Sequence, residues 1–145
     1  MNFQELLGDN IGEGAFREVF QHAEDPSLVI KVASNSTGID CNLTEYEIWN
    51  NAIPSRKYLA PVVNCSNNFK YIVMKKTKEL TIGNVKDAVI DVYKNYPVWL
   101  TDVVGHNMGY LNGNLVVHDY GTISWVAYPD PSLRENIFNI LKVIR

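Results

Sequence analysis

The sequence predicts an α+β fold in which a five-stranded antiparallel sheet carries one helix and is followed by a shorter second part. Two observations favour it. Short runs of β-branched and apolar residues alternate with turn residues in the first half of the chain, and a single segment with helical spacing interrupts them. No repeat, low-complexity tract or Gly/Ser linker divides the chain, so we expect one domain over residues 1–145.

The first three strands are expected at residues 6–11, 18–22 and 28–32. The segments Gly12-Glu13-Gly14 and Asp25-Pro26 separate them, and glycine and proline are the residues that most often interrupt regular structure. The three runs therefore predict a meander of neighbouring antiparallel strands.

A helix is predicted over residues 39–52, because apolar side chains recur there at steps of three and four residues. Asp40 or Asn42 could cap its start, and Pro54 fixes its end. The apolar positions are Ile39, Leu43, Tyr46, Trp49 and Ile53. This helix should pack on the sheet.

Residues 62–65 and 69–74 read as two more strands joined by the polar turn at 66–68, which completes the sheet. A second helix is predicted around residues 85–93, ending before Pro97.

Further along the chain, residues 108–111 and 115–118 flank Asn112-Gly113-Asn114 and predict a β-hairpin. The segment 132–135 has a capping-box pattern that opens a last helix with apolar residues up to Ile144.

Composition limits the classes of partner. The net charge of −3 and the pI near 5.5 argue against a broad basic face for nucleic acid. We expect no membrane segment and a cytoplasmic location, because no stretch has spanning length and the start lacks signal-peptide features. Cys41 and Cys65 are too few for a disulfide framework and fit a reduced compartment.

A glycine-rich motif lies between the first two predicted strands: Gly12, Gly14, the aromatic Phe16 and the apolar Val19. A dinucleotide-binding βαβ unit is excluded, since its glycines must open a helix. Between two strands, the glycines would let backbone N–H groups approach phosphates. A glycine-rich hairpin turn without a ligand is the alternative interpretation.

Lys31 stands at the end of the apolar run of the third strand. A lysine reaching out from a sheet edge is the ordinary interpretation, but a buried lysine needs an acidic partner. Glu45 in the predicted helix fits that role better than Glu47, because Ile48 and Trp49 then lie on the core side of the next turn.

Asp102, Asn107 and Asp119, followed by Tyr120-Gly121, have the order and spacing of a phosphoryl-transfer site. Each residue alone could be a helix cap or a turn residue. Together with the glycine motif, Lys31 and Glu45, they resemble the signature of the protein-kinase-like superfamily over roughly the first 121 positions.

The resemblance implies a single kinase-like domain: residues 1–74 as the N-lobe with its five-stranded sheet and helix, 75–77 as the hinge, and 78–145 as a much reduced C-lobe. It also implies ATP and Mg²⁺ as cofactors, with Lys31 holding phosphates while paired to Glu45. Asn107 and Asp119 would hold the metal, and Asp102 would take the acceptor's proton. The nucleotide would contact Gly12, Gly14, Phe16, Val19, Lys31, Met74, Lys75 and Lys76.

The sequence also departs from the family pattern. Arg17 replaces the third glycine, where it should stiffen the loop tip and place a cation near the nucleotide. Leu100-Thr101 precede Asp102 where the family usually has His-Arg, and Val104 stands where a lysine is usual. Little chain follows Gly121, so most of the C-lobe on which peptides dock is missing.

The leading functional hypothesis is a minimal serine/threonine-type kinase acting on a protein, which could be the kinase itself. A catalytically weak or inactive kinase-like module that occupies and inhibits a partner is the alternative, and a small-molecule kinase of the aminoglycoside type is the third. The chain is similar to small kinase-like proteins of bacterial viruses, which would place it in the host cytoplasm. The sequence does not indicate the acceptor or the oligomeric state.

Overall fold

A computed structural model describes residues 2–51, 53–80 and 107–122. The chain divides into two compact units, residues 1–53 with 60–76 and residues 54–59 with 77–145, which we describe separately. The α+β class is confirmed, with a five-stranded antiparallel sheet and one α-helix in the first unit. The helices predicted near 85–93 and after 132 lie outside the described residues.

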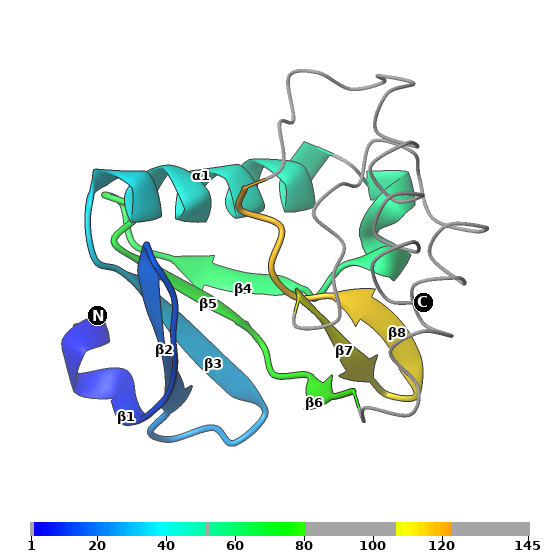
Figure 1. The fold of residues 1–145 in the computed structure, drawn as a ribbon, viewed down its shortest axis with the longest axis horizontal. Helices are drawn as coiled ribbons and strands as arrows, with labels where there is room; N and C mark the ends of the chain where they lie inside the picture. Colours follow the sequence, from blue (N-terminus) through cyan, green and yellow to red (C-terminus); the bar gives the residue numbers. More distant parts are fainter. Residues whose placement is uncertain (1, 52, 81–106, 123–145) are drawn as a thin grey trace. The chain divides into compact units, whose positions relative to one another are not determined.

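The sheet of the first unit has the order β1-β2-β3-β5-β4, with every pair antiparallel (Figure 1). All five predicted strands are present, and their bounds differ from the prediction by two residues at most. The strands are β1 (Leu7–Glu13), β2 (Arg17–His22), β3 (Leu28–Ala33), β4 (Val62–Cys65) and β5 (Tyr71–Lys75).

One face of this sheet buries an apolar cluster of Leu28, Ile30 and Val73. The short 3-10 helix η1 (Phe3–Leu6) packs against the cluster through Phe3 and Leu6. The ring of Phe3 stacks on that of Tyr71 at a centroid distance of 5.6 Å, which fixes η1 to β5.

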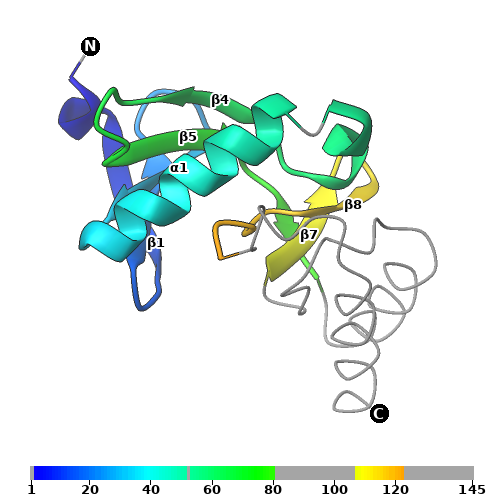
Figure 2. The ribbon, with the colours of Figure 1, turned by 90° about the horizontal axis from the view of Figure 1, so that it is seen from above.

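The opposite face carries α1 (Ser36–Asn51), which runs over the strands in Figures 1 and 2. The predicted caps, Asp40 and Asn42, are wrong because the helix begins earlier than its apolar pattern. The cap is Asn35, whose Oδ1 accepts a hydrogen bond from the backbone N–H of Gly38 at 2.9 Å. The 3-10 helix η2 (Ile53–Tyr58) follows α1.

Gly38 explains how closely α1 approaches the sheet. A Cβ at this position would overlap the backbone carbonyl oxygen of Phe16 and lie 3.0 Å from Cα of Ala33. The start of α1 therefore lies directly against the loop between β1 and β2 and against the end of β3, and only glycine leaves room for both.

The second unit contains a three-stranded sheet in the order β6-β7-β8. Its strands are β6 (Lys78–Glu79), β7 (Met108–Leu111) and β8 (Asn114–Val117). The predicted hairpin is confirmed, and its turn has positive φ at Asn112 (52°) and Gly113 (82°), as a two-residue type I′ turn requires. The pattern did not predict β6, which is only two residues long.

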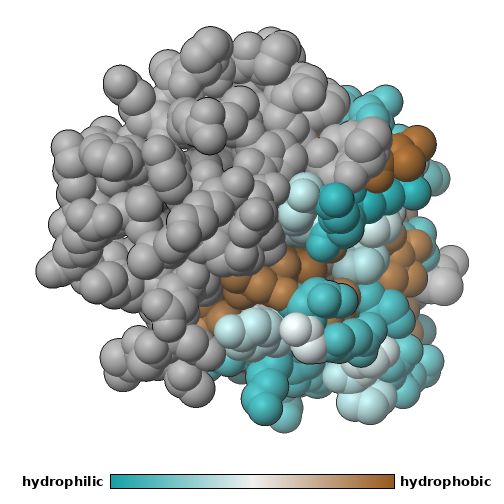
Figure 3. Space-filling view, turned by 90° about the vertical axis from the view of Figure 1, so that its right-hand side faces the viewer, coloured by the Kyte–Doolittle hydropathy of each residue, from teal (hydrophilic) through white to brown (hydrophobic). Residues whose placement is uncertain are grey.

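The surface of the described residues is mixed. On the face shown in Figure 3, hydrophilic residues predominate and apolar residues form smaller brown areas. None of the helices within the described segments is long and apolar enough to cross a bilayer.

Candidate functional site

Strand register places three of the predicted nucleotide-binding residues in one row across the sheet. Gly12 on β1 pairs with Val19 on β2, and Val19 pairs with Lys31 on β3. A Cβ built on Gly12 would lie 3.7 Å from Cβ of Val19, so the two positions are in side-by-side contact. Residues far apart in the sequence thus form a continuous row across β1, β2 and β3.

Lys31 is paired with Glu45, as the sequence predicts. Its ammonium donates to Oε2 of Glu45 at 3.0 Å and to Oε1 at 3.2 Å. Lys31 is 5% exposed and Glu45 is fully buried, whereas Glu47, the competing partner, is exposed. The pair therefore joins β3 to α1 inside the first unit.

Arg17 also binds Glu45. Its guanidinium donates to Oε1 at 2.5 Å and to Oε2 at 3.2 Å, a two-pronged contact with the same carboxylate that Lys31 holds. From the sequence, Arg17 is expected to stiffen the loop tip and to place a cation near the nucleotide; the structure shows that its guanidinium is buried and bound to Glu45. Its side chain points to the α1 face of the sheet, since Arg17 lies two residues before Val19 and strand side chains alternate.

Asn42 extends this network to the turn between β4 and β5. Its Oδ1 accepts from Arg17 at 3.0 Å, while its amide donates to the carbonyl oxygens of Phe69 at 2.7 Å and Lys70 at 3.2 Å. Phe69 has a φ of 58°, a rare conformation for a non-glycine residue. The buried amide side chain thus holds a strained turn and the arginine at once.

The two cations control the ionisation of Glu45. Burial raises the pKa of this carboxyl, but the charges of Arg17 and Lys31 and their hydrogen bonds outweigh burial and lower the pKa from 4.5 to about 2. Glu45 is therefore an anion at neutral pH, although it is buried.

The glycine loop is short and anchored. The N–H of Gly14 donates to the carbonyl of Arg17 at 2.9 Å, and the carbonyl of Phe16 accepts from the N–H of Ser34 at 2.8 Å. Neither Gly12 nor Gly14 has a positive φ, and a Cβ on either would meet nothing closer than 3.7 Å. The hairpin itself therefore does not require glycine at these two positions.

The predicted adenine contacts lie at the end of β5. Met74 is buried and lies on the same face as Lys31, because Val29 pairs with Met74 and Lys31 pairs with Ile72. The backbone N–H of Lys75 donates to the carbonyl oxygen of Pro61 at 3.0 Å, and that of Lys76 donates to the carbonyl oxygen of Ser27 at 2.8 Å. Both backbone N–H groups therefore already have hydrogen-bond acceptors within the first unit.

In the second unit, the hairpin brings Asn107 and Asp119 together. Asn107 precedes β7, and its carbonyl oxygen accepts from the N–H groups of His118 at 2.8 Å and Asp119 at 3.3 Å. This follows from the turn, because its register places Asn107 opposite His118, just beyond the pair Met108 and Val117. Asp102, the predicted catalytic base, lies outside the described residues.

The donor chemistry of Asn107 and Asp119 fits Mg²⁺, which takes hard oxygen ligands such as carboxylate and amide oxygens. Within residues 2–51, 53–80 and 107–122, no group of three His, Cys, Asp or Glu side chains is arranged to hold a metal.

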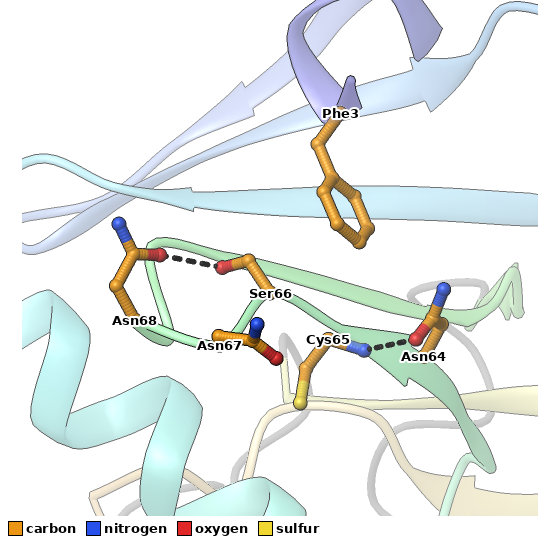
Figure 4. Close-up of a pocket in the computed structure, with 6 residues that line it drawn as sticks. All are labelled: Phe3, Asn64, Cys65, Ser66, Asn67 and Asn68. Carbon is orange, nitrogen blue, oxygen red and sulfur yellow. Dashed lines mark hydrogen bonds between the residues drawn. The ribbon is translucent and has the colours of Figure 1, made fainter. Parts of the chain in front are cut away.

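An open cavity of about 480 Å³ lies elsewhere in the first unit, beside η1 and the β4–β5 turn (Figure 4). Its lining residues are Phe3, Asn64, Cys65, Ser66, Asn67 and Asn68. Asn64 accepts from the N–H of Cys65 at 2.9 Å, and partial burial raises the pKa of the Cys65 thiol. This cavity contains none of the residues that the sequence analysis selects.

Sequence reasoning missed Arg17 and Asn42 as members of the buried network. A signal for Arg17 was available, because alternation along β2 puts it on the same face as Val19 and Lys31. For Asn42 there was none, since its partners come from a turn whose position depends on the fold.

No protein-family model matches the chain, and no curated protein matches it.

Proposed function

We propose that this chain is an ATP- and Mg²⁺-dependent phosphotransferase, and specifically a minimal serine/threonine-type protein kinase. The observation that carries the proposal is the buried ion pair between Lys31 on β3 and Glu45 on α1, in one row with Val19 and Gly12. Burying a lysine in a sheet is costly, and positioning it for phosphate is one reason for a protein to retain it.

In this proposal Lys31 contacts the phosphates, and the backbone of the loop around Gly12 and Gly14 covers them. The space above both glycines supports that role, because the hairpin does not need glycine there. Asn107 and Asp119 would hold Mg²⁺, which neutralises phosphate charge when bound. Asp102 would orient the acceptor hydroxyl and take its proton.

Calorimetric titration with ATP tests binding. We expect the wild type to bind ATP more tightly with Mg²⁺ than without it. Gly12→Ala should weaken binding of MgATP about tenfold while thermal unfolding stays unchanged, because the new methyl group fits the free hairpin but obstructs a phosphate. If the wild type releases no binding heat with MgATP at millimolar concentration, the proposal is wrong.

Incubation with radiolabelled ATP and Mg²⁺ tests transfer. The wild type should incorporate phosphate into itself or an added protein, and Asp119→Ala should lose this incorporation because a metal ligand is removed. Equal background labelling in both proteins, despite binding of MgATP, would rule out a kinase and leave a nucleotide-binding module.

A kinase-like module that binds and inhibits a partner is the second candidate. The contact of Arg17 with Glu45 favours it, because two cations on one buried carboxylate also make a purely structural cluster. An effect on the partner that persists in the Lys31→Ala and Asp102→Ala variants would select this candidate. Release of ADP in the presence of a hydroxylated metabolite would instead select a small-molecule kinase.

A further inference from the structure

Two cations, Arg17 and Lys31, share the buried carboxylate of Glu45. Both carboxylate oxygens are contacted twice, once by the guanidinium of Arg17 and once by the ammonium of Lys31. A buried carboxylate that loses its sole cation is strongly destabilised, because the remaining charge has no compensation. Glu45 would keep a cation if either Arg17 or Lys31 turned to another anion.

The two cations are not equivalent. Arg17 is fixed by a second acceptor, the side-chain oxygen of Asn42, and its planar fork matches the carboxylate at two points. Lys31 carries a compact ammonium on a flexible stem, which can reorient with little change to the backbone. The more adaptable of the two cations is also the one that lies in one row with Val19 and Gly12.

We propose that Arg17 is a positioning residue that serves as the permanent counter-ion of Glu45 and so allows Lys31 to bind phosphate. When Lys31 shifts toward a phosphate oxygen, Arg17 keeps Glu45 ionised and oriented. The second half of this inference, the binding of phosphate by Lys31, rests on the proposed nucleotide function. The first half, the sharing of Glu45 by two cations, is tested without nucleotide.

Urea unfolding of four proteins tests the sharing: the wild type, Arg17→Met, Lys31→Met and the double variant. Methionine retains most of the side-chain packing while removing the charge. Each single variant should remain folded, because the other cation stays on Glu45. The double variant should lose much more stability than the two single losses added together. Additive losses would overturn the proposal.

A fifth protein keeps the test decisive if the double variant does not fold. Adding Glu45→Leu to the double variant removes the carboxylate that the cations neutralise and replaces the cluster with apolar side chains. This triple variant should be more stable than the double variant. If it is equally unstable, the loss came from packing and Arg17 is not a counter-ion.

Titration with MgATP tests the second half. Arg17→Met should weaken MgATP binding at least tenfold, because Lys31 must then neutralise Glu45 without Arg17 and is drawn to the carboxylate. Lys70→Met makes the same change at an exposed lysine and should bind as the wild type does. Wild-type affinity in Arg17→Met would overturn the positioning role. Absence of binding in the wild type would instead refute the proposed function, while the unfolding cycle still decides the sharing of Glu45.

Discussion

Both faces of the five-stranded sheet bury apolar side chains, but only the face under α1 also buries charged ones. The face under η1 buries Leu28, Ile30 and Val73, which need only apolar neighbours. The face under α1 also buries apolar side chains, among them Ile72 and Met74, but it buries Arg17 and Lys31 as well, and their charges are matched by Glu45 of α1. Successive side chains of a strand point to opposite faces, so Ile30 and Lys31, which are neighbours in β3, lie on different faces.

Apolar and charged side chains contribute differently to the stability of the two faces. Apolar burial stabilises a fold in proportion to area, while a buried ion cluster contributes little net stability and is often replaceable by hydrophobic residues. The face under α1 therefore departs from the ordinary apolar core pattern at one site, the charged face around Arg17, Lys31 and Glu45. Such departures are expected at functional sites.

The largest effect should come from removing the acid of the charged face. Glu45→Ala leaves the buried Arg17 and Lys31 without this carboxylate, so the free energy of unfolding should fall by roughly 3–5 kcal/mol. Urea unfolding measures it. Glu47→Ala on the exposed side of the same helix is the control and should change stability by less than about 0.5 kcal/mol. Similar losses in the two variants would contradict the buried network.

Acid should remove the same interaction gradually. The pKa of Glu45 in the folded state, about 2, is below its ordinary value of 4.5, so its contribution is fully present above pH 4.5 and is lost as the pH falls toward 2. The loss over this window should be roughly 3 kcal/mol.

Unfolding measured between pH 5 and pH 2.5 tests this, with Glu45→Ala as the control. The variant should lose less stability over the window than the wild type. Asp25, whose pKa is lowered by hydrogen bonds from Ser27, contributes equally to both proteins. Parallel pH profiles would mean that Glu45 does not titrate in this way.

A smaller effect is expected from the close approach of α1 to the sheet. Gly38→Ala adds a methyl group that overlaps the carbonyl oxygen of Phe16, so stability should fall by about 1–3 kcal/mol. Thermal unfolding measures it. Gly12→Ala, at a position with room for the methyl group, is the matched control and should leave the melting temperature within about 1–2 °C.

The smallest effect should come from shortening a side chain on the face under η1. Ile30→Val removes one methyl group from a fully buried side chain, and the expected cost is about 1 kcal/mol. Because the opposite face is untouched, MgATP affinity should equal that of the wild type. A large change in affinity from this substitution would show that the two faces are coupled.

The sequence was sufficient for the presence of the strands and the helix of the first unit, but not for the buried face of the helix. Ile39 and Tyr46 of the predicted apolar pattern are exposed, and the buried residues of α1 are Gly38, Cys41, Asn42, Glu45 and Ile48.

The sequence also failed at the start of α1, where Ser36, Thr37 and Gly38 carry no apolar pattern and the cap is Asn35. It also missed β6, whose two residues pair with β7 only through tertiary contact.

For the candidate site, the pairing of Lys31 with Glu45 was predictable from a lysine in an apolar strand and an acid on the next helix. The juxtaposition of Asn107 and Asp119 follows from the Asn112-Gly113 turn, which fixes the hairpin register. The contact of Arg17 with Glu45 was not predicted, because Arg17 was assigned to the loop and is the first residue of β2.

The sequence by itself determined the order of strands and helix, the chemistry available to the site, and the partner of Lys31. These are local properties, set by side-chain periodicity, turn residues and charge. Tertiary structure alone decided that Arg17 shares Glu45 and that Asn42 joins them to the β4–β5 turn. Such contacts link residues from three elements, and their geometry exists only once the helix has packed on the sheet.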